Sequence, residues 1–128
     1  MVTDPIADLL VRLQNASRVG HIRMSLPSSK IKVAIAQVLE REGYIAEIEK
    51  SKKPNSLSLM LAYKNGRPAV SGFKRISKLS RRMYTGVHDI RPVKRGHGLL
   101  VLSTPAGVIT GKQAREKRVG GEVLFEIW

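Results

Sequence analysis

Few residues of the types that perform catalysis stand at the spacings that catalysis needs. The three histidines, His21, His88 and His97, are scattered, and none has a carboxylate or a second histidine at metal-ligand spacing. We expect them in surface or loop positions. Ser103 lacks the glycine-flanked motif that exposes a nucleophilic serine on a sharp turn. The sequence therefore predicts neither a metal site nor an enzyme active site.

Two other patterns match chemical motifs only weakly. The GHG of Gly96–Gly98 lacks the third glycine of a dinucleotide-binding fingerprint, and it precedes the expected strand instead of following it. Asp4 and Asp8 share one face of a predicted helix. Beside the helix start, they are more typical of charges that complement the helix dipole than of an acid/base pair. We therefore expect no cofactor.

A cationic cluster is the pattern that favours a binding function. In Lys74–Tyr84 (KRISKLSRRMY), the residues Arg75, Lys78, Arg81 and Arg82 recur at steps of three and four. As a helix the segment would present one cationic face, and as a loop it would be a flexible basic arm. A merely solvated face is the alternative, but like charges so close repel, and an anionic partner removes that cost. We expect contact with a polyanion.

Small neutral residues form two stretches among the cations, STPAG at Ser103–Gly107 and VGGE at Val119–Glu122. Lysine and arginine attract phosphate without regard to base identity. Short hydroxyls and exposed backbone amides, in contrast, can approach bases and 2′-hydroxyls closely. Each stretch is equally compatible with an ordinary turn or helix terminus. Spacing alone leaves both interpretations open.

The composition is that of a strongly basic chain with enough apolar residues for a core. The 128 residues include 23 Lys+Arg and 10 Asp+Glu, for a formal net charge of +13, and 42% are hydrophobic. Residues 1–62 contain 9 Lys+Arg and 6 Asp+Glu, whereas residues 63–128 contain 14 and 4. The second half therefore holds most of the excess positive charge, which attracts nucleic acid, anionic lipid or acidic protein.

Several classes of protein are disfavoured. No apolar run approaches the ~20 residues of a membrane span, and MVTDPIADLL lacks the basic start of a signal peptide. Cysteine is absent, which excludes disulfides and thiolate metal sites and suits a reducing compartment.

Apolar periodicity predicts an α-β-α-β-β lobe over residues 1–65. Thr3 or Asp4 caps a first helix that ends at Gly20, and Ser28–Ser29 precede a second helix that ends near Gly43. The expected apolar stripes of the helices are Ile6, Leu9, Leu10 and Leu13, and Ile31, Ala34, Ile35, Val38 and Leu39. The expected strands are His21–Leu26, one with Tyr44, Ala46 and Ile48 on a face, and one with Leu57, Leu59, Leu61 and Tyr63 on a face.

Residues 66–128 are predicted to form a mostly β, basic lobe with one short helix. Lys64–Ala69 (KNGRPA) is the expected linker. Thr110 and Gln113 form a capping box for the helix GKQAREK. The expected strands are Val70–Phe73, Leu99–Leu102, Val108–Ile109 and the C-terminal GEVLFEIW, in which Val123, Phe125 and Ile127 alternate with Leu124, Glu126 and Trp128. The predicted fold class is α+β, with the first lobe packed against the second.

Three separated motifs carry a resemblance to a known family. STPAGVITGKQAREKRVGGEVLFEIW resembles the C-terminal signature of the eighth protein of the bacterial small ribosomal subunit. TDPIADLLVRLQNA resembles the opening of that family, and LPSSKIKVAIAQVLEREGYI resembles its second helix. The likeness spans nearly the whole chain, and the two-lobed α+β fold that it implies agrees with the fold predicted from periodicity.

The resemblance implies a structural constituent of the small ribosomal subunit, in the cytoplasm. It implies direct binding to the central domain of small-subunit ribosomal RNA, at a helix interrupted by an irregular internal loop, and a role in subunit assembly. Neighbouring small-subunit ribosomal proteins would be partners. A second implied role is repression of the chain's own operon through its messenger RNA. The chain would be a monomer outside the ribosome, with no membrane, metal or cofactor.

The resemblance also assigns an RNA-binding set. It comprises a hydroxyl loop of Ser103, Thr104 and Gly107 and a second surface of Gly120, Gly121 and Glu122. Two single residues complete it, Tyr84 and, in the P-S-S-K loop, Lys30. The cationic cluster adds Arg75, Arg81 and Arg82 as phosphate contacts. In this assignment the hydroxyls bond bases or sugars and Tyr84 stacks on a base or ribose. Glu122 either orders the loop or accepts from a base amino group.

The chain departs from the family pattern at a few positions. Pro105 stands where many relatives have a second serine, so that hydroxyl contact is lost. Leu79–Ser80 replaces the usual Pro-Gly turn, Arg81 adds a charge, and Ile109 replaces a methionine. A basic adaptor that docks on an acidic protein or an anionic surface is the alternative function.

Overall fold

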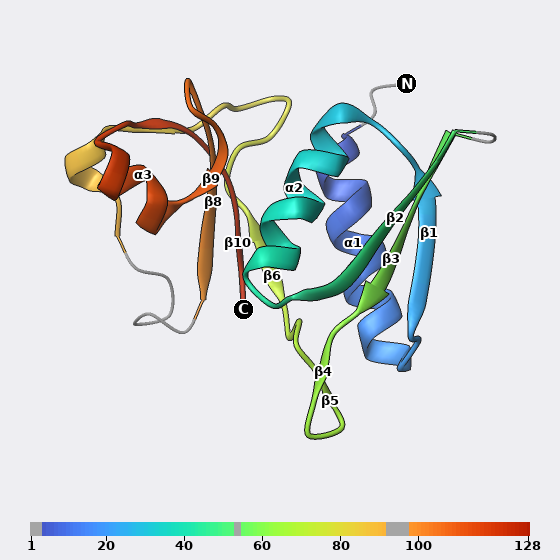
Figure 1. Cartoon of the computed structure of the whole chain (residues 1–128). Coiled ribbons are helices and arrows are strands. Elements are labelled where there is room, and N and C mark those ends of the chain that lie inside the picture. Colours follow the sequence, from blue (N-terminus) through green and yellow to red (C-terminus); the bar gives the residue numbers. More distant parts are fainter. Residues whose placement is uncertain (1–3, 53–54, 92–97) are drawn as a thin grey trace. The chain divides into compact units, whose positions relative to one another are not determined.

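The computed structural model describes residues 4–52, 55–91 and 98–128 and confirms the α+β class (Figure 1). The chain divides into two compact units, Met1–Ser71 and Gly72–Trp128, here called unit 1 and unit 2. Thr3, a predicted cap, and Gly96 and His97, predicted loop residues, lie outside the described residues.

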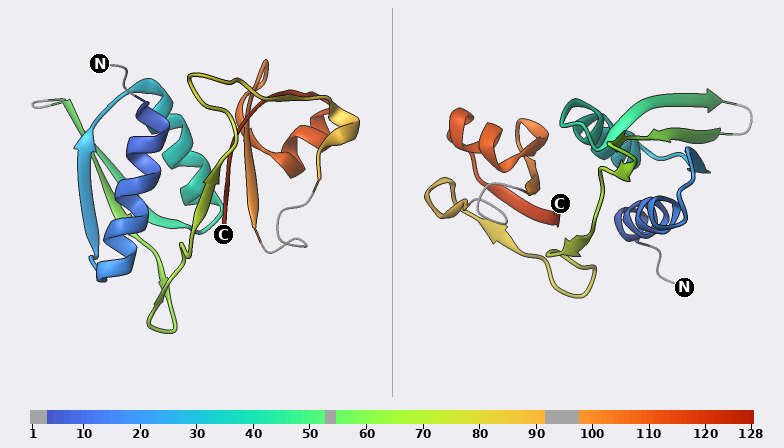
Figure 2. Two further views of the ribbon diagram at one scale, coloured as in Figure 1. Left: turned by 180° about the vertical axis from the view of Figure 1, so that it is seen from behind. Right: turned by 90° about the horizontal axis from the view of Figure 1, so that it is seen from below.

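Unit 1 places two helices on one face of a three-stranded antiparallel sheet of order β1-β3-β2 (Figures 1 and 2). Its elements are α1 (Pro5–Val19), β1 (Arg23–Pro27), α2 (Lys30–Arg41), β2 (Ile45–Lys52), β3 (Asn55–Leu61), β4 (Tyr63–Lys64) and β5 (Arg67–Pro68). The central strand β3 buries Leu57, Leu59 and Leu61 as predicted. Alternation thus directs one face of the sheet to the helices.

Side-chain caps determine where both helices begin. The Asp4 carboxylate accepts hydrogen bonds from the backbone N–H groups of Ile6 and Ala7, both at 3.1 Å. The Ser29 hydroxyl accepts from the N–H of Lys32 at 3.3 Å. These bonds satisfy donors that the first helical turn leaves without intrahelical partners.

The buried face of α2 differs from the predicted stripe. Ile35, Val38 and Leu39 are buried as predicted, but Ile31 and Ala34 are only half-buried. The remaining core positions of the helix are taken by Lys32 and Ala36. The predicted stripe did not include Lys32, because a buried ammonium requires partners that apolar periodicity does not reveal.

Lys32 is only 6% exposed and binds two elements of unit 1 to α2. Its ammonium donates to the Asp8 carboxylate at 3.1 Å and to the Pro27 carbonyl at 3.0 Å. Asp8 also accepts from Arg12, one turn along α1, at 2.8 Å. The Arg12 hydrogen bond lowers the pKa of the Asp8 carboxyl, partial burial opposes this effect, and Lys32 lowers the pKa further. Asp8 therefore serves an ion pair between helices, not an acid/base pair with Asp4.

A bulge in β2 breaks the shared face that was predicted for Ala46 and Ile48. Ile45 pairs with Leu61 whereas Glu47 pairs with Met60, so Ala46 is the extra residue. Ile45 is 1% exposed and takes the core position, while Ala46 is exposed. Strict alternation through Ala46 could not anticipate the extra residue.

The predicted linker Lys64–Ala69 forms a small hairpin instead. Strands β4 and β5 pair across the two-residue turn Asn65–Gly66. Tyr63, which was expected to share a face with Leu57, Leu59 and Leu61 of the preceding strand, lies in β4 instead and is partly exposed. The Asn-Gly pair is the strongest local signal for a two-residue hairpin turn, and it overrides the linker interpretation.

Unit 2 is built around the C-terminal strand. Its elements are β6 (Phe73–Arg75), β7 (Tyr84–Thr85), the 3₁₀ helix η1 (Val87–Asp89), β8 (Leu99–Thr104), β9 (Gly107–Thr110), α3 (Gly111–Lys117) and β10 (Gly121–Ile127). The sheet order is β6-β10-β8-β9, and β7 also pairs with β10. The strand predicted at Val70–Phe73 begins only at Phe73. The capping box of Thr110 and Gln113 is confirmed, with bonds of 3.0 and 3.1 Å.

A second bulge corrects the alternation predicted for β10. Val123 pairs with Leu102, and Phe125 pairs with the adjacent Val101, so Leu124 is the extra residue. Val123 and Phe125 consequently lie on opposite faces of the sheet, contrary to the prediction. All three residues of the bulge are buried.

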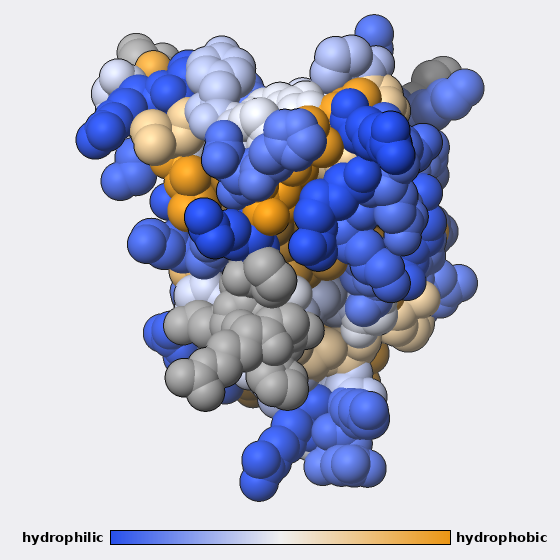
Figure 3. Space-filling view, turned by 90° about the vertical axis from the view of Figure 1, so that its left-hand side faces the viewer, coloured by the Kyte–Doolittle hydropathy of each residue, from blue (hydrophilic) through white to orange (hydrophobic). Residues whose placement is uncertain are grey.

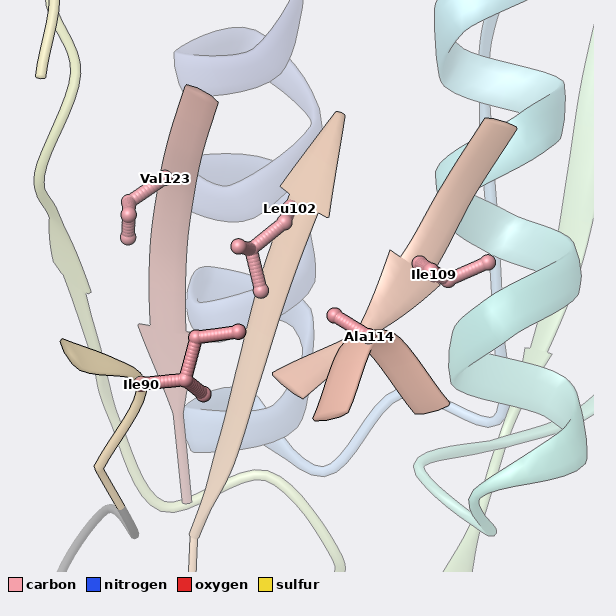
Figure 4. Close-up of a cluster of buried hydrophobic side chains, with 5 residues drawn as sticks. All are labelled: Ile90, Leu102, Ile109, Ala114 and Val123. Carbon is pink, nitrogen blue, oxygen red and sulfur yellow. The ribbon is translucent and has the colours of Figure 1, made fainter. Parts of the chain in front are cut away.

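The face of the sheet toward α3 carries the core cluster shown in Figure 4. Its buried members are Ile90, Leu102, Ile109, Ala114 and Val123, which come from the segment after η1, β8, β9, α3 and β10. This cluster fixes β8, β9 and β10 against the helix, so the strand ends beyond it have defined positions.

Candidate functional site

One rung of the unit 2 sheet aligns several of the predicted site residues. Tyr84 of β7 pairs with Glu122 of β10, Glu122 pairs with Ser103 of β8, and Ser103 pairs with Val108 of β9. Residues directly opposite one another project from the same face, with Cβ atoms about 5 Å apart. Leu102, the residue before Ser103 in β8, projects from the face of the sheet that packs against α3. Because side chains alternate along a strand, Ser103 and its row project from the opposite face. We call this row the polar row.

The members of the polar row offer different chemistry. Tyr84 is 71% exposed, and an exposed aromatic side chain can stack on an unpaired base. Ser103 is half-buried, and a serine hydroxyl can both donate and accept. The Glu122 carboxylate accepts only. Val108 was missed by the sequence analysis, since only pairing to β8 brings it into the row.

Arg82 forms an ion pair with Glu122, the carboxylate in the middle of the polar row. Its guanidinium donates to Glu122 at 3.0 Å, with the Arg82 side chain 49% exposed and that of Glu122 16% exposed. The pair compensates the negative charge that would otherwise repel phosphate. The carboxylate thus orients an arginine at the edge of the row.

Thr104 has a different position from Ser103. As the next residue in β8, it projects from the opposite face. Its hydroxyl accepts from the N–H of Ala106 at 3.1 Å and donates to the carbonyl of Gly107 at 3.0 Å. These bonds close the turn between β8 and β9, so Thr104 shapes the loop from which Pro105 and Ala106 protrude.

Gly120 and Gly121 permit a close approach of three backbone segments. A Cβ on Gly121 would lie 2.2 Å from the Ser103 carbonyl oxygen, and one on Gly120 would lie 2.3 Å from that of Thr85. Real Cβ atoms do not approach a carbonyl so closely, so larger residues would push the strands apart. The two glycines therefore set the spacing of the strands that carry the polar row.

The cationic cluster is not a helix. After β6, the backbone of Lys78 and Arg81 exchanges hydrogen bonds of 2.8 and 3.0 Å, which closes a two-residue turn at Leu79–Ser80. Lys78 and Arg81 are exposed at this turn, close in sequence to Arg82. The turn thus presents cations beside the strand that carries Tyr84.

Ser77 secures the base of that turn and was missed by the sequence analysis. It is 1% exposed, and its hydroxyl accepts from the N–H of Met83 at 2.7 Å. The Met83 carbonyl in turn accepts from the N–H of Val123 at 2.9 Å. A serine within a basic segment carries no signal for this role, because only the folded turn supplies its partner.

Two predicted site residues are not members of the polar row. The Arg75 guanidinium donates to the Leu124 carbonyl at 2.7 Å and is partly buried, so it ties β6 to the bulge of β10. Lys30 lies in unit 1, exposed at the start of α2, where it lines an open hollow with Ser28 and Lys50. The structure thus gathers Ser103, Tyr84, Arg82 and Glu122 within unit 2. Arg75 instead bonds β6 to β10, and Lys30 belongs to unit 1.

Within residues 4–52, 55–91 and 98–128, no three His, Cys, Asp or Glu side chains are grouped as a metal site. Over the same residues, no helix has the length and apolar character needed to cross a membrane.

Comparison with known proteins identifies the family. The family model described as ribosomal protein S8 matches residues 4–128. The chain belongs to the ribosomal protein S8 family. The resemblance indicated by the three sequence motifs is therefore confirmed, and the family is one of ribosomal proteins, not of enzymes.

Relatives match this S8-family chain over nearly their whole length. A protein of Nitratidesulfovibrio vulgaris strain DP4 is 47% identical, and the match covers 100% of both chains. One from Roseiflexus castenholzii is 47% identical over 99% of this chain and 98% of its own. One from Xanthomonas euvesicatoria is 49% identical over 96% of each. All three are named small ribosomal subunit protein uS8.

Proposed function

We propose that the chain is a constituent of the small ribosomal subunit in the cytoplasm and binds small-subunit ribosomal RNA directly through the polar row. The subunit assignment rests on family membership and on the names of the full-length relatives. The observation that supports RNA contact is the rung of Tyr84, Glu122 and Ser103, flanked by Arg82. Neighbouring ribosomal proteins are further expected partners.

The chemistry of the row suits an RNA element with unpaired bases. A regular A-form helix hides its base edges in a deep, narrow major groove, whereas an internal loop exposes bases for stacking and hydrogen bonding. Tyr84 would stack on a base or ribose, and the Ser103 hydroxyl would bond a base edge or a 2′-hydroxyl. Arg81 and Arg82 would neutralise phosphates beside it. The proposed target is an irregular internal loop in the central domain of the ribosomal RNA.

Thr104, Gly107, Gly120 and Gly121 have supporting roles in this proposal. Thr104 and Gly107 hold the β8–β9 turn, whose backbone lies beside the row. The two glycines let β10 approach β8 and the end of β7. A messenger RNA that offers the same interrupted helix would bind the same row, which would permit repression of the chain's own operon.

The deciding experiment compares two RNAs that differ only in the internal loop. The first is the interrupted helix from the central domain of Nitratidesulfovibrio vulgaris small-subunit ribosomal RNA, and the second is a fully paired duplex of equal length. We expect filter binding to show at least ~100-fold tighter binding of the first at fixed salt. Equal binding would leave only electrostatic attraction and would favour the basic adaptor.

A further inference from the structure

The β4–β5 hairpin of unit 1 has a preformed tip. Asn65 and Gly66 have φ angles of +54° and +77°, the left-handed backbone that a type I′ turn requires at both central positions. Asparagine and glycine tolerate this region best, and such a turn matches the natural twist of the strands that it joins. The tip therefore needs little ordering when a partner binds.

The base of the hairpin is anchored to the body of unit 1. The N–H of Ala69 donates to the carbonyl of Ala62 at 2.9 Å. The Tyr63 hydroxyl donates to the carbonyl of His21, in the connection between α1 and β1. In Figure 1 the hairpin extends downward from the unit 1 sheet. The lowest part of the space-filling view in Figure 3 is hydrophilic.

The hairpin places two cations directly opposite each other. Lys64 and Arg67 are paired across the ladder and both are exposed. Like charges at such positions repel, and in the part of the chain that the structure describes neither makes an ion pair. No acidic residue occurs in the sequence between Asp8 and Glu40 or between Glu49 and Asp89. The hairpin and the connection that anchors it therefore contain no carboxylate to relieve the repulsion.

A surface hollow accompanies these charges. Its volume is about 560 Å³, and its lining comprises Lys64, Asn65, Arg67, Pro68 and Ala69. The side chains supply two cations and one amide that can both donate and accept. A phosphodiester flanked by sugar hydroxyls offers the matching anion and hydrogen-bonding groups. The tip lacks the large apolar side chains with which a membrane-surface segment would insert.

We propose that the β4–β5 hairpin is a second RNA contact, at which Lys64 and Arg67 hold the phosphate backbone of a ribosomal RNA strand. The inference rests on the proposed function, since the row in unit 2 would bring the chain to RNA. It extends that function to unit 1, where the hairpin adds attraction without base recognition.

Because the chain contains no cysteine, a single introduced thiol can carry a tethered iron chelate that cleaves nearby RNA. Ala69→Cys places the chelate at the hollow, and Ala106→Cys places it at the β8–β9 turn beside the polar row. The probe is the full-length small-subunit ribosomal RNA of Nitratidesulfovibrio vulgaris. We expect each variant to cut the RNA at its own set of positions. Cuts from Ala106→Cys without cuts from Ala69→Cys would overturn the hairpin inference alone, and no cuts from either would overturn the proposed function as well.

Charge removal tests the roles of the two cations. Adding Lys64→Ala and Arg67→Ala to the Ala69→Cys variant should reduce its cuts to background. In the otherwise unaltered chain, the pair should make the salt dependence of binding shallower by about 1.5, since each phosphate contact contributes 0.7–0.9. Arg41→Ala with Lys52→Ala removes the same charge from unit 1 and should leave the cuts in place. If this control abolishes the cuts too, or if the hairpin pair leaves the salt dependence unchanged, the inference is wrong.

Discussion

Adjacent hydroxyls on β8 have separable roles at the scale of single residues. We expect Ser103→Ala to weaken binding of the interrupted RNA helix by about 1–3 kcal/mol, as the loss of one specific contact does, without altering its salt dependence. The Thr104 hydroxyl is already used in the turn. Thr104→Val should therefore lower the free energy of unfolding by about 1 kcal/mol, whereas Thr104→Ser retains the bonds. Filter binding and urea unfolding of the three variants check this, and an unchanged affinity for Ser103→Ala would contradict it.

Two neighbouring arginines should differ in their salt dependence. Arg81→Ala removes a cation exposed at the turn and should make the slope of log K against log salt shallower by about 0.7–0.9. The Arg82 guanidinium is already paired with Glu122. Arg82→Ala should therefore change the salt slope less than Arg81→Ala does, but it should leave the Glu122 carboxylate facing the RNA. Adding Glu122→Gln should then restore part of the affinity. Titrations across salt in a double-mutant cycle measure this coupling, and strictly additive losses would rule it out.

Among the elements, the junction of β7, β8 and β10 depends on glycine. Gly121→Ala would place a Cβ 2.2 Å from the Ser103 carbonyl oxygen. We expect a loss of about 1–3 kcal/mol in unfolding free energy from this overpacking, together with weaker RNA binding. Gly86→Ala is the matched control, because its Cβ would meet only the Asp89 carboxylate at an ordinary 3.6 Å. Equal stability of the two variants in urea would contradict a packing role for Gly121.

The contact between α1 and α2 should be sensitive to acid. Because the folded state lowers the pKa of Asp8, the stabilising effect of this carboxylate is complete above its ordinary pKa of 3.8. That effect is lost as the pH falls through the folded value. Asp8→Ala leaves the buried Lys32 ammonium with the Pro27 carbonyl, and we expect a loss of about 1–3 kcal/mol at pH 7.

Two comparisons separate this ion pair from general acid effects. Arg12→Ala removes an exposed partner and should cost less than about 1 kcal/mol. Lys32→Met with Asp8→Ala replaces the ions by apolar groups and should recover much of the loss. Urea unfolding between pH 7 and pH 3 gives the free energy of unfolding of each variant. If the double variant loses as much stability in acid as the unaltered chain does, Asp8 is not the source of the acid sensitivity.

For the whole molecule, the charge distribution and the polar row should govern different rate constants. If the chain binds RNA as proposed, its net charge of +13 would steer it toward the RNA, so the association rate constant should fall steeply with added salt. Ser103→Ala removes a short-range contact and should instead raise the dissociation rate constant. Surface plasmon resonance across salt separates the two, and a slower association of Ser103→Ala at fixed salt would contradict this division.

The sequence predicted most of the architecture and part of the candidate site. Periodicity identified α1, the core face of β3 and the α3 capping box, because local spacing determines these features. The sequence analysis missed the two bulges, at Ala46 and Leu124, and the burial of Lys32. These features depend on partners that are distant in the chain. The polar row follows from strand register, which places Tyr84 beside Glu122 and cannot be read from spacing along one strand.

The order β1-β3-β2 makes β1 and β2 the edge strands of the unit 1 sheet, and edge strands are where sheets of separate copies can pair. The central β3 contains no charged residue. The outer β2 carries Glu47, Glu49, Lys50 and Lys52, and the other edge, β1, carries Arg23 and ends with a proline that has no N–H to donate. Edge-to-edge pairing of two copies would have to desolvate these charges, so the sheet resists aggregation. We therefore expect the charges of β2 and the proline of β1 to keep the unit 1 sheets of separate copies from joining at their edges.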